Sequence, residues 1–180
     1  MSRVAGLSRF ESGTNSKTDG GHLVESGRKI FFARERVFKV RQWTPKNSFP
    51  TVYLCENVEA ALQEYLARGR RMKLPDCKSL PMVMAGVKVK AANLLDLTDA
   101  EIAAVIKPLL EKDKIHWRAI QDRREAVSQA VGRAIREICF SGLIAPSQAL
   151  HGGKSIVVFP QKLTPADSLS ALALKPMPLK

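Results

Sequence analysis

Short apolar runs bounded by Gly, Pro or polar residues are the main pattern along the chain, and they predict strands. Two of these runs, Leu143–Ile144 and Ile156–Phe159, are entirely apolar and predict short buried strands on either side of a loop that contains Ser147. Further predicted strands lie within residues 30–40, at 51–55, and between 82 and 97. A serine next to a proline is typical of a turn, so Ser147 alone indicates no chemistry.

Apolar residues at helical spacing predict the helices. Asn57 stands at the N-cap position of a predicted helix of about four turns. A capping box at Thr98–Glu101 predicts the start of a second helix, which Pro108 should end or kink. Residues 116–139 predict one long helix or a broken pair, and residues 169–174 predict a final short helix. Strands and helices in this order, without a repeat, predict a mixed α/β or α+β layer arrangement.

The composition indicates a globular protein with an anionic partner. The 180 residues are 45% hydrophobic, which is enough for one domain with a substantial core. Lysine and arginine outnumber the acidic residues by 29 to 17, and the net charge of +12 favours nucleic acid, a phosphorylated ligand or an acidic protein. Residues 1–27 carry no periodic apolar pattern and predict a flexible leader, followed by a folded domain at 28–165 and a tail at 166–180.

Several site types are not indicated by the sequence. The three cysteines are far apart, and no histidine has a second ligand at metal spacing, so we expect neither a disulfide framework nor a metal site. The glycine patterns of dinucleotide and phosphate loops and the nucleophile elbow are missing, and Gly152–Ser155 is interpreted as a turn. Because no signal peptide or long apolar span is present, we expect a cytoplasmic protein without membrane contact.

Three polar residues stand in a suggestive order among the predicted elements. Tyr53 lies in a Val-Tyr-Leu strand, and Glu64 follows eleven residues later at the end of Ala-Leu-Gln-Glu, at the border of the apolar face of its helix. Ser147 ends the loop Gly-Leu-Ile-Ala-Pro-Ser. Arg68 is one turn beyond Glu64 and offers a simple ion pair as an alternative role for that carboxylate.

In these motifs and their spacing, residues 31–163 resemble the RES-domain family. The resemblance implies an α+β fold similar to that of ADP-ribosyltransferases. It also implies a toxin of a bacterial toxin–antitoxin pair that consumes NAD as its substrate and is held in check by a cognate antitoxin. The positive charge of this chain would suit an acidic antitoxin.

The resemblance also implies roles for individual residues. Glu64 would hold the ribose hydroxyls and offset the charge of an oxocarbenium ion, while Tyr53 would stack on nicotinamide and donate its hydroxyl. Ser147 would orient the dinucleotide and needs no activating base. The family carries Gly-Gly-Arg-Trp-Asn where this chain has Lys39-Val-Arg-Gln-Trp-Thr-Pro45, so Arg41 is assigned to the pyrophosphate, with Arg34 and Arg36 as alternatives.

Two questions stay open at this point. The acceptor of the ADP-ribosyl group is phosphate, water or a protein side chain, because all three share the first half of the reaction. The competing class of function is a basic, non-enzymatic nucleic-acid-binding protein, which the charge and the arginines of residues 116–139 favour. An aromatic content of 6% and basic residues dispersed along the chain speak against it.

Overall fold

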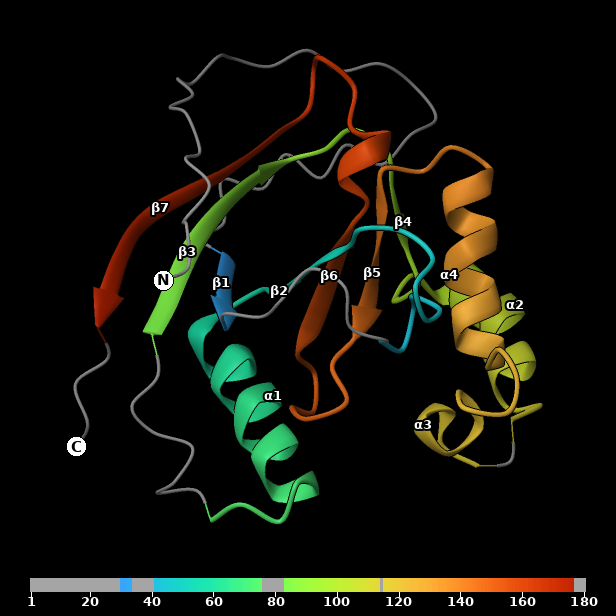
Figure 1. The fold of residues 1–180 in the computed structure, drawn as a ribbon. Coiled ribbons are helices and arrows are strands. Elements are labelled where there is room, and N and C mark those ends of the chain that lie inside the picture. Colours follow the sequence, from blue (N-terminus) through green and yellow to red (C-terminus); the bar gives the residue numbers. More distant parts are fainter. Residues whose placement is uncertain (1–29, 34–40, 76–82, 114, 177–180) are drawn as a thin grey trace.

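A computed structural model describes residues 30–33, 41–75, 83–113 and 115–176 (Figure 1). Within these ranges seven strands form one hydrogen-bonded sheet in the order β4-β5-β6-β2-β1-β3-β7. The strands are β1 (Ile30–Ala33), β2 (Val52–Cys55), β3 (Val83–Lys90), β4 (Leu94–Asp96), β5 (Gly142–Pro146), β6 (Lys154–Val158) and β7 (Ser168–Pro176). The helices are α1 (Val58–Arg71), α2 (Ala100–Leu110), α3 (Trp117–Ile120) and α4 (Val127–Glu137).

The sheet consists of two groups of strands. Strands β5, β6 and β2 pair antiparallel over four or five residues each, and β4 adds a parallel edge to them. Strands β1, β3 and β7 form the second antiparallel group, which joins the first through the pair Phe31 and Cys55. The predicted α+β class is confirmed. The strands of the two groups run in different directions on either side of this narrow junction, as Figure 1 shows.

The main core lies between these two groups of strands. Val87 and Val89 of β3 pack with Leu54 of β2 and Val158 of β6, and all four are at least 93% buried. Side chains alternate between the faces of a strand, so Tyr53 and Cys55 point to the face opposite Leu54. The second face is therefore the one that presents Tyr53.

Helices cover this second face at two places (Figure 1). Helix α1 packs Ala61 against Met84, beside Cys55. Helix α4 packs Ile135 against Leu143, Val157 and Phe159 of β5, β6 and the residue after β6, and α2 adds partly buried apolar residues to the same cluster. Glu64 belongs to α1, and Tyr53 is partly buried against the cluster beneath α4.

Most predicted elements are confirmed. The 51–55 strand, the two strands around Ser147 and the broken pair of helices in 116–139 are present. The Asn57 side chain caps α1 by accepting a 2.8 Å hydrogen bond from the Ala60 amide. Pro108 lies two residues before the end of α2, and Gly152 turns the chain with φ of 73°.

Two local predictions were wrong. Asp99, not Thr98, caps α2, because its carboxylate accepts from the amides of Glu101 and Ile102 while the Thr98 hydroxyl donates to Asp96 at 2.6 Å. Residues 169–174 belong to strand β7 instead of a helix. Their Ala and Leu content favours a helix locally, but pairing with β3 satisfies the backbone and packs Leu169 on the main core.

Some predictions concern residues that the structure does not describe. The leader, Arg34, Arg36 and the basic residues up to 40 lie outside the described residues. The division of the chain at 27 and 165 remains a prediction. In the part of the chain that is described, each helix is too short or too polar to traverse a lipid bilayer.

Candidate functional site

The turn that carries Arg41 is fastened to α4. Arg41 and Thr44 form an isolated antiparallel bridge, and Trp43 between them is only 4% exposed. Gly132 of α4 lies directly beneath the Trp43 carbonyl, where a Cβ atom would stand 2.0 Å from the oxygen. The Gln129 amide donates to the Arg41 carbonyl at 3.1 Å. Backbone contacts with α4 therefore set the position of Arg41.

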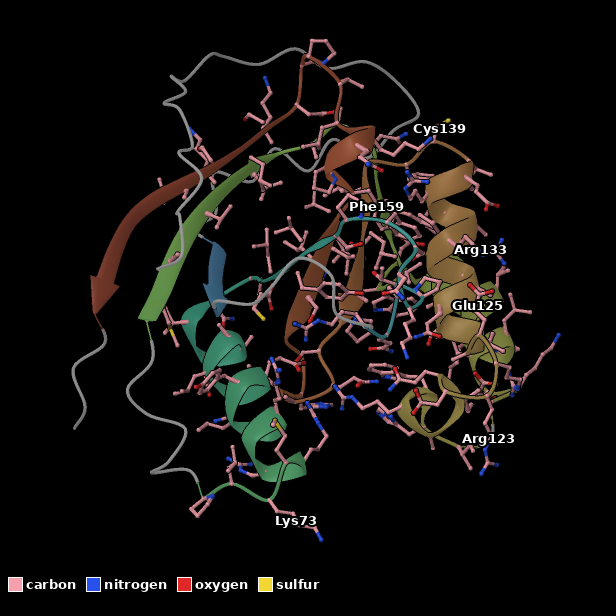
Figure 2. All side chains as sticks on the ribbon, in the orientation of Figure 1. Lys73, Arg123, Glu125, Arg133, Cys139 and Phe159 are labelled. Carbon is pink, nitrogen blue, oxygen red and sulfur yellow. The ribbon has the colours of Figure 1, made fainter. Side chains whose placement is uncertain are left out.

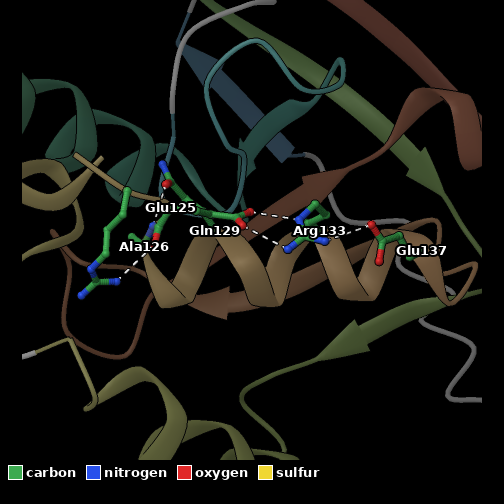
Figure 3. A network of polar contacts seen from close by, with 6 residues as sticks. Glu125, Ala126, Gln129, Arg133 and Glu137 are labelled. Atoms are coloured by element: carbon green, nitrogen blue, oxygen red, sulfur yellow. Dashed lines mark hydrogen bonds and ion pairs between the residues drawn. The ribbon is translucent and has the colours of Figure 1, made fainter. Parts of the chain in front are cut away.

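Gln129 is itself held at the start of α4 (Figure 3). Its side-chain oxygen accepts a 3.1 Å hydrogen bond from the Ala126 amide, which otherwise has no helical partner. Both ends of the buried Gln129 amide are thus satisfied. Arg133, one turn beyond Gln129, pairs with Glu125 and Glu137 on the exposed side of the helix and takes no part in the site.

Tyr53 faces the turn from strand β2. Its hydroxyl accepts from the Trp43 amide at 3.1 Å and lies 2.9 Å from the Thr44 hydroxyl. Thr44 donates to Thr51 at 3.1 Å, so the Tyr53 proton points to Thr44 and the hydroxyls form a chain. Burial raises the pKa of Tyr53 far above its usual value, against the opposing effect of these hydrogen bonds, so the phenol is neutral.

Arg41 stacks against the same aromatic ring. Its guanidinium carbon lies 5.4 Å from the centroid of the Tyr53 ring, which is within cation–π range. Because the hydroxyl of Tyr53 already serves Trp43 and Thr44, the ring is the part of this residue that remains for contact with a ligand. The first pair of predicted site residues is therefore in contact.

Glu64 and Ser147 form the second pair, although 83 residues separate them in the chain. The Ser147 hydroxyl donates to Glu64 Oε1 at 2.7 Å, and the Gln148 amide donates to the same oxygen at 3.1 Å. The amides of Ala149 and Leu150 donate to the Ser147 hydroxyl at 3.2 Å each. Ser147 is thus both a turn residue and the group that orients the carboxylate.

Electrostatic effects connect the two pairs. Burial, together with the charges of Glu64 and Glu56, raises the pKa of the Cys55 thiol to about 12. Cys55 lies two residues from Tyr53 and points to the same face of the sheet. The charge of Glu64 therefore acts on Cys55, which is the last residue of β2 and lies two residues beyond Tyr53.

Arg118 of the short helix α3 interacts electrostatically with Glu64. Burial and the charges of Arg71 and Arg68 lower the pKa of Arg118, whereas Glu64 raises it. Arg118 also lies over the Trp117 ring at 4.6 Å from its centroid. Short helix α3 thus contributes a guanidinium to the neighbourhood of the carboxylate.

Sequence reasoning missed Arg118 and the Gln148 amide. A backbone amide leaves no signal in the residue types, and Arg118 is one of several arginines in residues 116–139. Its position beside a tryptophan was the only available indication. Among the described residues, no cluster of three or more His, Cys, Asp or Glu is placed to hold a metal ion.

Comparisons with known proteins identify the family and the fold of the chain. The family model of the RES domain matches residues 32–176. A chain in the crystal structure of the M. tuberculosis MbcT–MbcA toxin–antitoxin complex has a similar fold, with a TM-score of 0.61 and 18% sequence identity over 86% of each chain. No curated protein matches the chain.

Proposed function

Because the chain belongs to the RES-domain family, we propose that it is the toxin of a toxin–antitoxin pair and that it cleaves the bond between nicotinamide and ribose in NAD. The 2.7 Å contact between Ser147 and Glu64 carries this proposal, since it orients the carboxylate of a helix that packs on the same face of the sheet as Tyr53, whose ring lies under the Arg41 guanidinium. The similarity in fold to a chain of a toxin–antitoxin complex supports the biological role.

The carboxylate accounts for the bond-breaking step. Nicotinamide leaves with the electron pair of the C–N bond, and positive charge develops on the ribose ring. Glu64, fixed by Ser147 and the Gln148 amide, offsets that charge without having to reorient during the reaction. Within the described residues both of these bonds end on Oε1, so Oε2 is left for the ribose hydroxyls.

Ser147 acts by positioning and not as a nucleophile. Its hydroxyl proton goes to Glu64, and its lone pairs accept the amides of Ala149 and Leu150. A nucleophile would need a lone pair directed at the ribose carbon. The turn therefore orients the carboxylate, and the carboxylate acts on the substrate.

The first pair of residues accounts for binding. The partly buried Tyr53 ring would stack on nicotinamide, and the Arg41 guanidinium can bind two oxygens of the pyrophosphate at once. The ADP-ribosyl group passes to phosphate, to water or to a side chain of a cellular protein. We propose that an antitoxin, acidic to match the net charge of +12, blocks the toxin in the cytoplasm, where its substrate is found.

A variant of Glu64 tests the reaction directly. Glu64→Gln keeps an oxygen that accepts from Ser147 but removes the negative charge. We expect nicotinamide release from NAD, measured by chromatography with and without added phosphate, to fall by roughly a hundredfold or more. Glu59→Gln is the matched control, because Glu59 lies exposed on the same helix.

Two results would contradict the proposal. One is the absence of NAD loss and of ADP-ribose transfer to lysate proteins with the unmodified chain. The other is equal turnover by the Glu64→Gln and Glu59→Gln variants. Salt-sensitive binding of DNA or RNA without NAD turnover would instead favour the nucleic-acid-binding function.

A further inference from the structure

Ser155 of β6 lies on the face of the sheet that carries Tyr53. The next residue, Ile156, packs in the main core, so the Ser155 side chain points to the opposite face. Ser155 pairs with Cys55 of β2, which points to the same face as Tyr53. The Ser155 side chain is partly exposed, and its hydroxyl makes no hydrogen bond to any described residue. This face therefore presents a hydroxyl group that is open to a ligand.

The strand register places Ser155 between the two pairs of site residues. Strand β6 lies between β2 and β5 (Figure 1). On β2, Tyr53 pairs with Val157 and is therefore a diagonal neighbour of Ser155. Beyond β5, the Ser147 amide donates to the Gly153 carbonyl at 2.8 Å, so Ser147 is a diagonal neighbour of Ser155 on the other side. Diagonal neighbours lie about 7 to 8 Å apart, a distance that one ligand can span.

The bond between Glu64 and Ser147 crosses the strand that carries Ser155. Helix α1 contacts β1 and β2, and Cys55 packs against the cluster that this helix forms. The Glu64 carboxylate nevertheless reaches Ser147, just beyond β5. Because β6 separates β2 from β5, Glu64 extends across the end of β6 where Ser155 lies. Phe159, labelled in Figure 2, follows the other end of this strand.

The surroundings of Ser155 suit a neutral polar group of a ligand. Cys55 and the fully buried Ala145 stand directly opposite it on the two neighbouring strands. Burial, together with the charges of Glu64 and Glu56, raises the pKa of the Cys55 thiol to about 12, so the thiol is uncharged at physiological pH. The Glu64 carboxylate repels an anionic group. An amide or a hydroxyl is therefore favoured here over a phosphoryl group.

We propose that Ser155 binds the carboxamide group of nicotinamide and thereby selects the leaving group. This inference rests on the proposed cleavage of NAD, in which nicotinamide stacks on Tyr53 and Glu64 holds the ribose hydroxyls. The Tyr53 hydroxyl is engaged by Trp43 and Thr44, so it is not open to the carboxamide. The hydroxyl of Ser155 lies diagonally beside the Tyr53 ring, and it can donate to the carboxamide oxygen or accept from its nitrogen.

Binding of free nicotinamide to the full chain tests this role without turnover. Pyridine is the matched probe, because it has the same ring and lacks the carboxamide. We expect Ser155→Ala to weaken the affinity for nicotinamide, measured by ligand-observed NMR titration, about 3-fold to 10-fold and to leave the affinity for pyridine unchanged. Ser170→Ala is the control, because Ser170 is a partly buried serine on β7, and it should alter neither affinity.

Two measurements protect the test against a misfolded variant. The Ser155 hydroxyl has no hydrogen bond among the described residues, so Ser155→Ala should shift the melting temperature by no more than about 2 °C. The affinity for pyridine reports on the ring-binding surface in the same sample. Equal losses of affinity for nicotinamide and pyridine, or no loss for either, would overturn the role of Ser155. An unmodified chain that binds nicotinamide no more tightly than pyridine would also overturn it.

The binding readout separates this inference from the proposed reaction. If Ser155→Ala loses affinity for nicotinamide alone in a chain that leaves NAD intact, the carboxamide contact stands and the reaction is rejected. If cleavage of NAD requires Glu64 while Ser155→Ala binds nicotinamide as tightly as the unmodified chain does, the reaction stands and the carboxamide contact is rejected.

Discussion

The two halves of the candidate site are built on different principles. On the Tyr53 side, every polar atom of the central hydroxyl chain has a partner, and the residues around it are buried against α4. On the Glu64 side, one carboxylate oxygen takes both available bonds, and the neighbouring Arg118 keeps a buried donor without a partner in the described residues. One half is saturated with internal contacts, and the other leaves contacts for a ligand.

This difference separates stability from function within one site. Residues of the Tyr53 side contribute packing and hydrogen bonds to the folded state, so their loss should mainly reduce the free energy of unfolding. Under the proposed function, polar groups of the Glu64 side gain their full interactions only when a ligand is present, as is typical of binding sites. Substitutions in the two halves should therefore produce opposite ratios of stability loss to activity loss.

The largest loss of stability is expected from Gly132→Ala. Helix propensity alone would make this change favourable by about 1 kcal/mol. The new Cβ would instead stand 2.0 Å from the Trp43 carbonyl oxygen, which is backbone and buried beside its side chain. We expect a net loss of about 3 kcal/mol in urea denaturation, because the turn with Arg41 must move away from α4.

Ala134→Gly is the control that shows how a change between alanine and glycine alters the unfolding free energy where no contact with the turn is involved. Ala134 is exposed on the same helix, so its substitution should cost only the propensity difference of about 1 kcal/mol. A Gly132→Ala variant that is as stable as the unmodified chain or more stable would show that the turn is not held against α4 by this contact.

Tyr53→Phe should have the next largest effect on stability. It leaves the buried Trp43 amide and the Thr44 hydroxyl without their partner, at a cost of about 2 kcal/mol. The raised pKa of Tyr53 adds a pH dependence: the folded state retains the proton when the unfolded state loses it near pH 10.0. The stabilising contribution of the Tyr53 hydroxyl is therefore fully present below that pH and is lost as the pH rises above it.

Urea denaturation of the unmodified chain and Tyr53→Phe, at several pH values from about 8 to about 11, measures both effects. The difference in unfolding free energy should be constant below pH 10.0 and should narrow above it. A difference that widens with pH would mean that the phenol ionises more readily in the folded chain than in the unfolded one.

Local sequence motifs predicted three of the residues in this comparison. The features that the motifs did not predict depend on contacts between distant parts of the chain. Tyr53, Glu64 and Ser147 stand in short patterns that mark a strand, a helix face and a turn, and the fold brings the last two within 2.7 Å. The engagement of the Tyr53 hydroxyl depends on a turn held by Gly132, 79 residues further along the chain than Tyr53. A short sequence motif cannot reveal a contact between residues so far apart in the chain.

The two wrong predictions and the missed Arg118 also result from contacts that only the folded chain makes. Residues 169–174 have helical composition, but the open edge of β3 makes them a strand, and an edge is visible only in the assembled sheet. Thr98 and Asp99 are both good N-caps, and the neighbouring Asp96 decides between them by accepting the Thr98 proton. Arg118 resembles other arginines until the fold places it against Trp117 near Glu64.

Ser147→Ala should show the smallest loss of stability and the clearest loss of activity. The bonds that it removes lie at a partly exposed turn, where water replaces them, so we expect a cost of about 1 kcal/mol or less. Glu64 would lose one of its two orienting donors, and nicotinamide release should fall about 10-fold to 100-fold. Ser48→Ala removes a comparable 2.9 Å bond to the Pro45 carbonyl in an exposed turn, and it should leave turnover unchanged. If Ser147→Ala is as destabilising as Tyr53→Phe while it retains activity, the serine belongs to the saturated half, and its contact with Glu64 is structural.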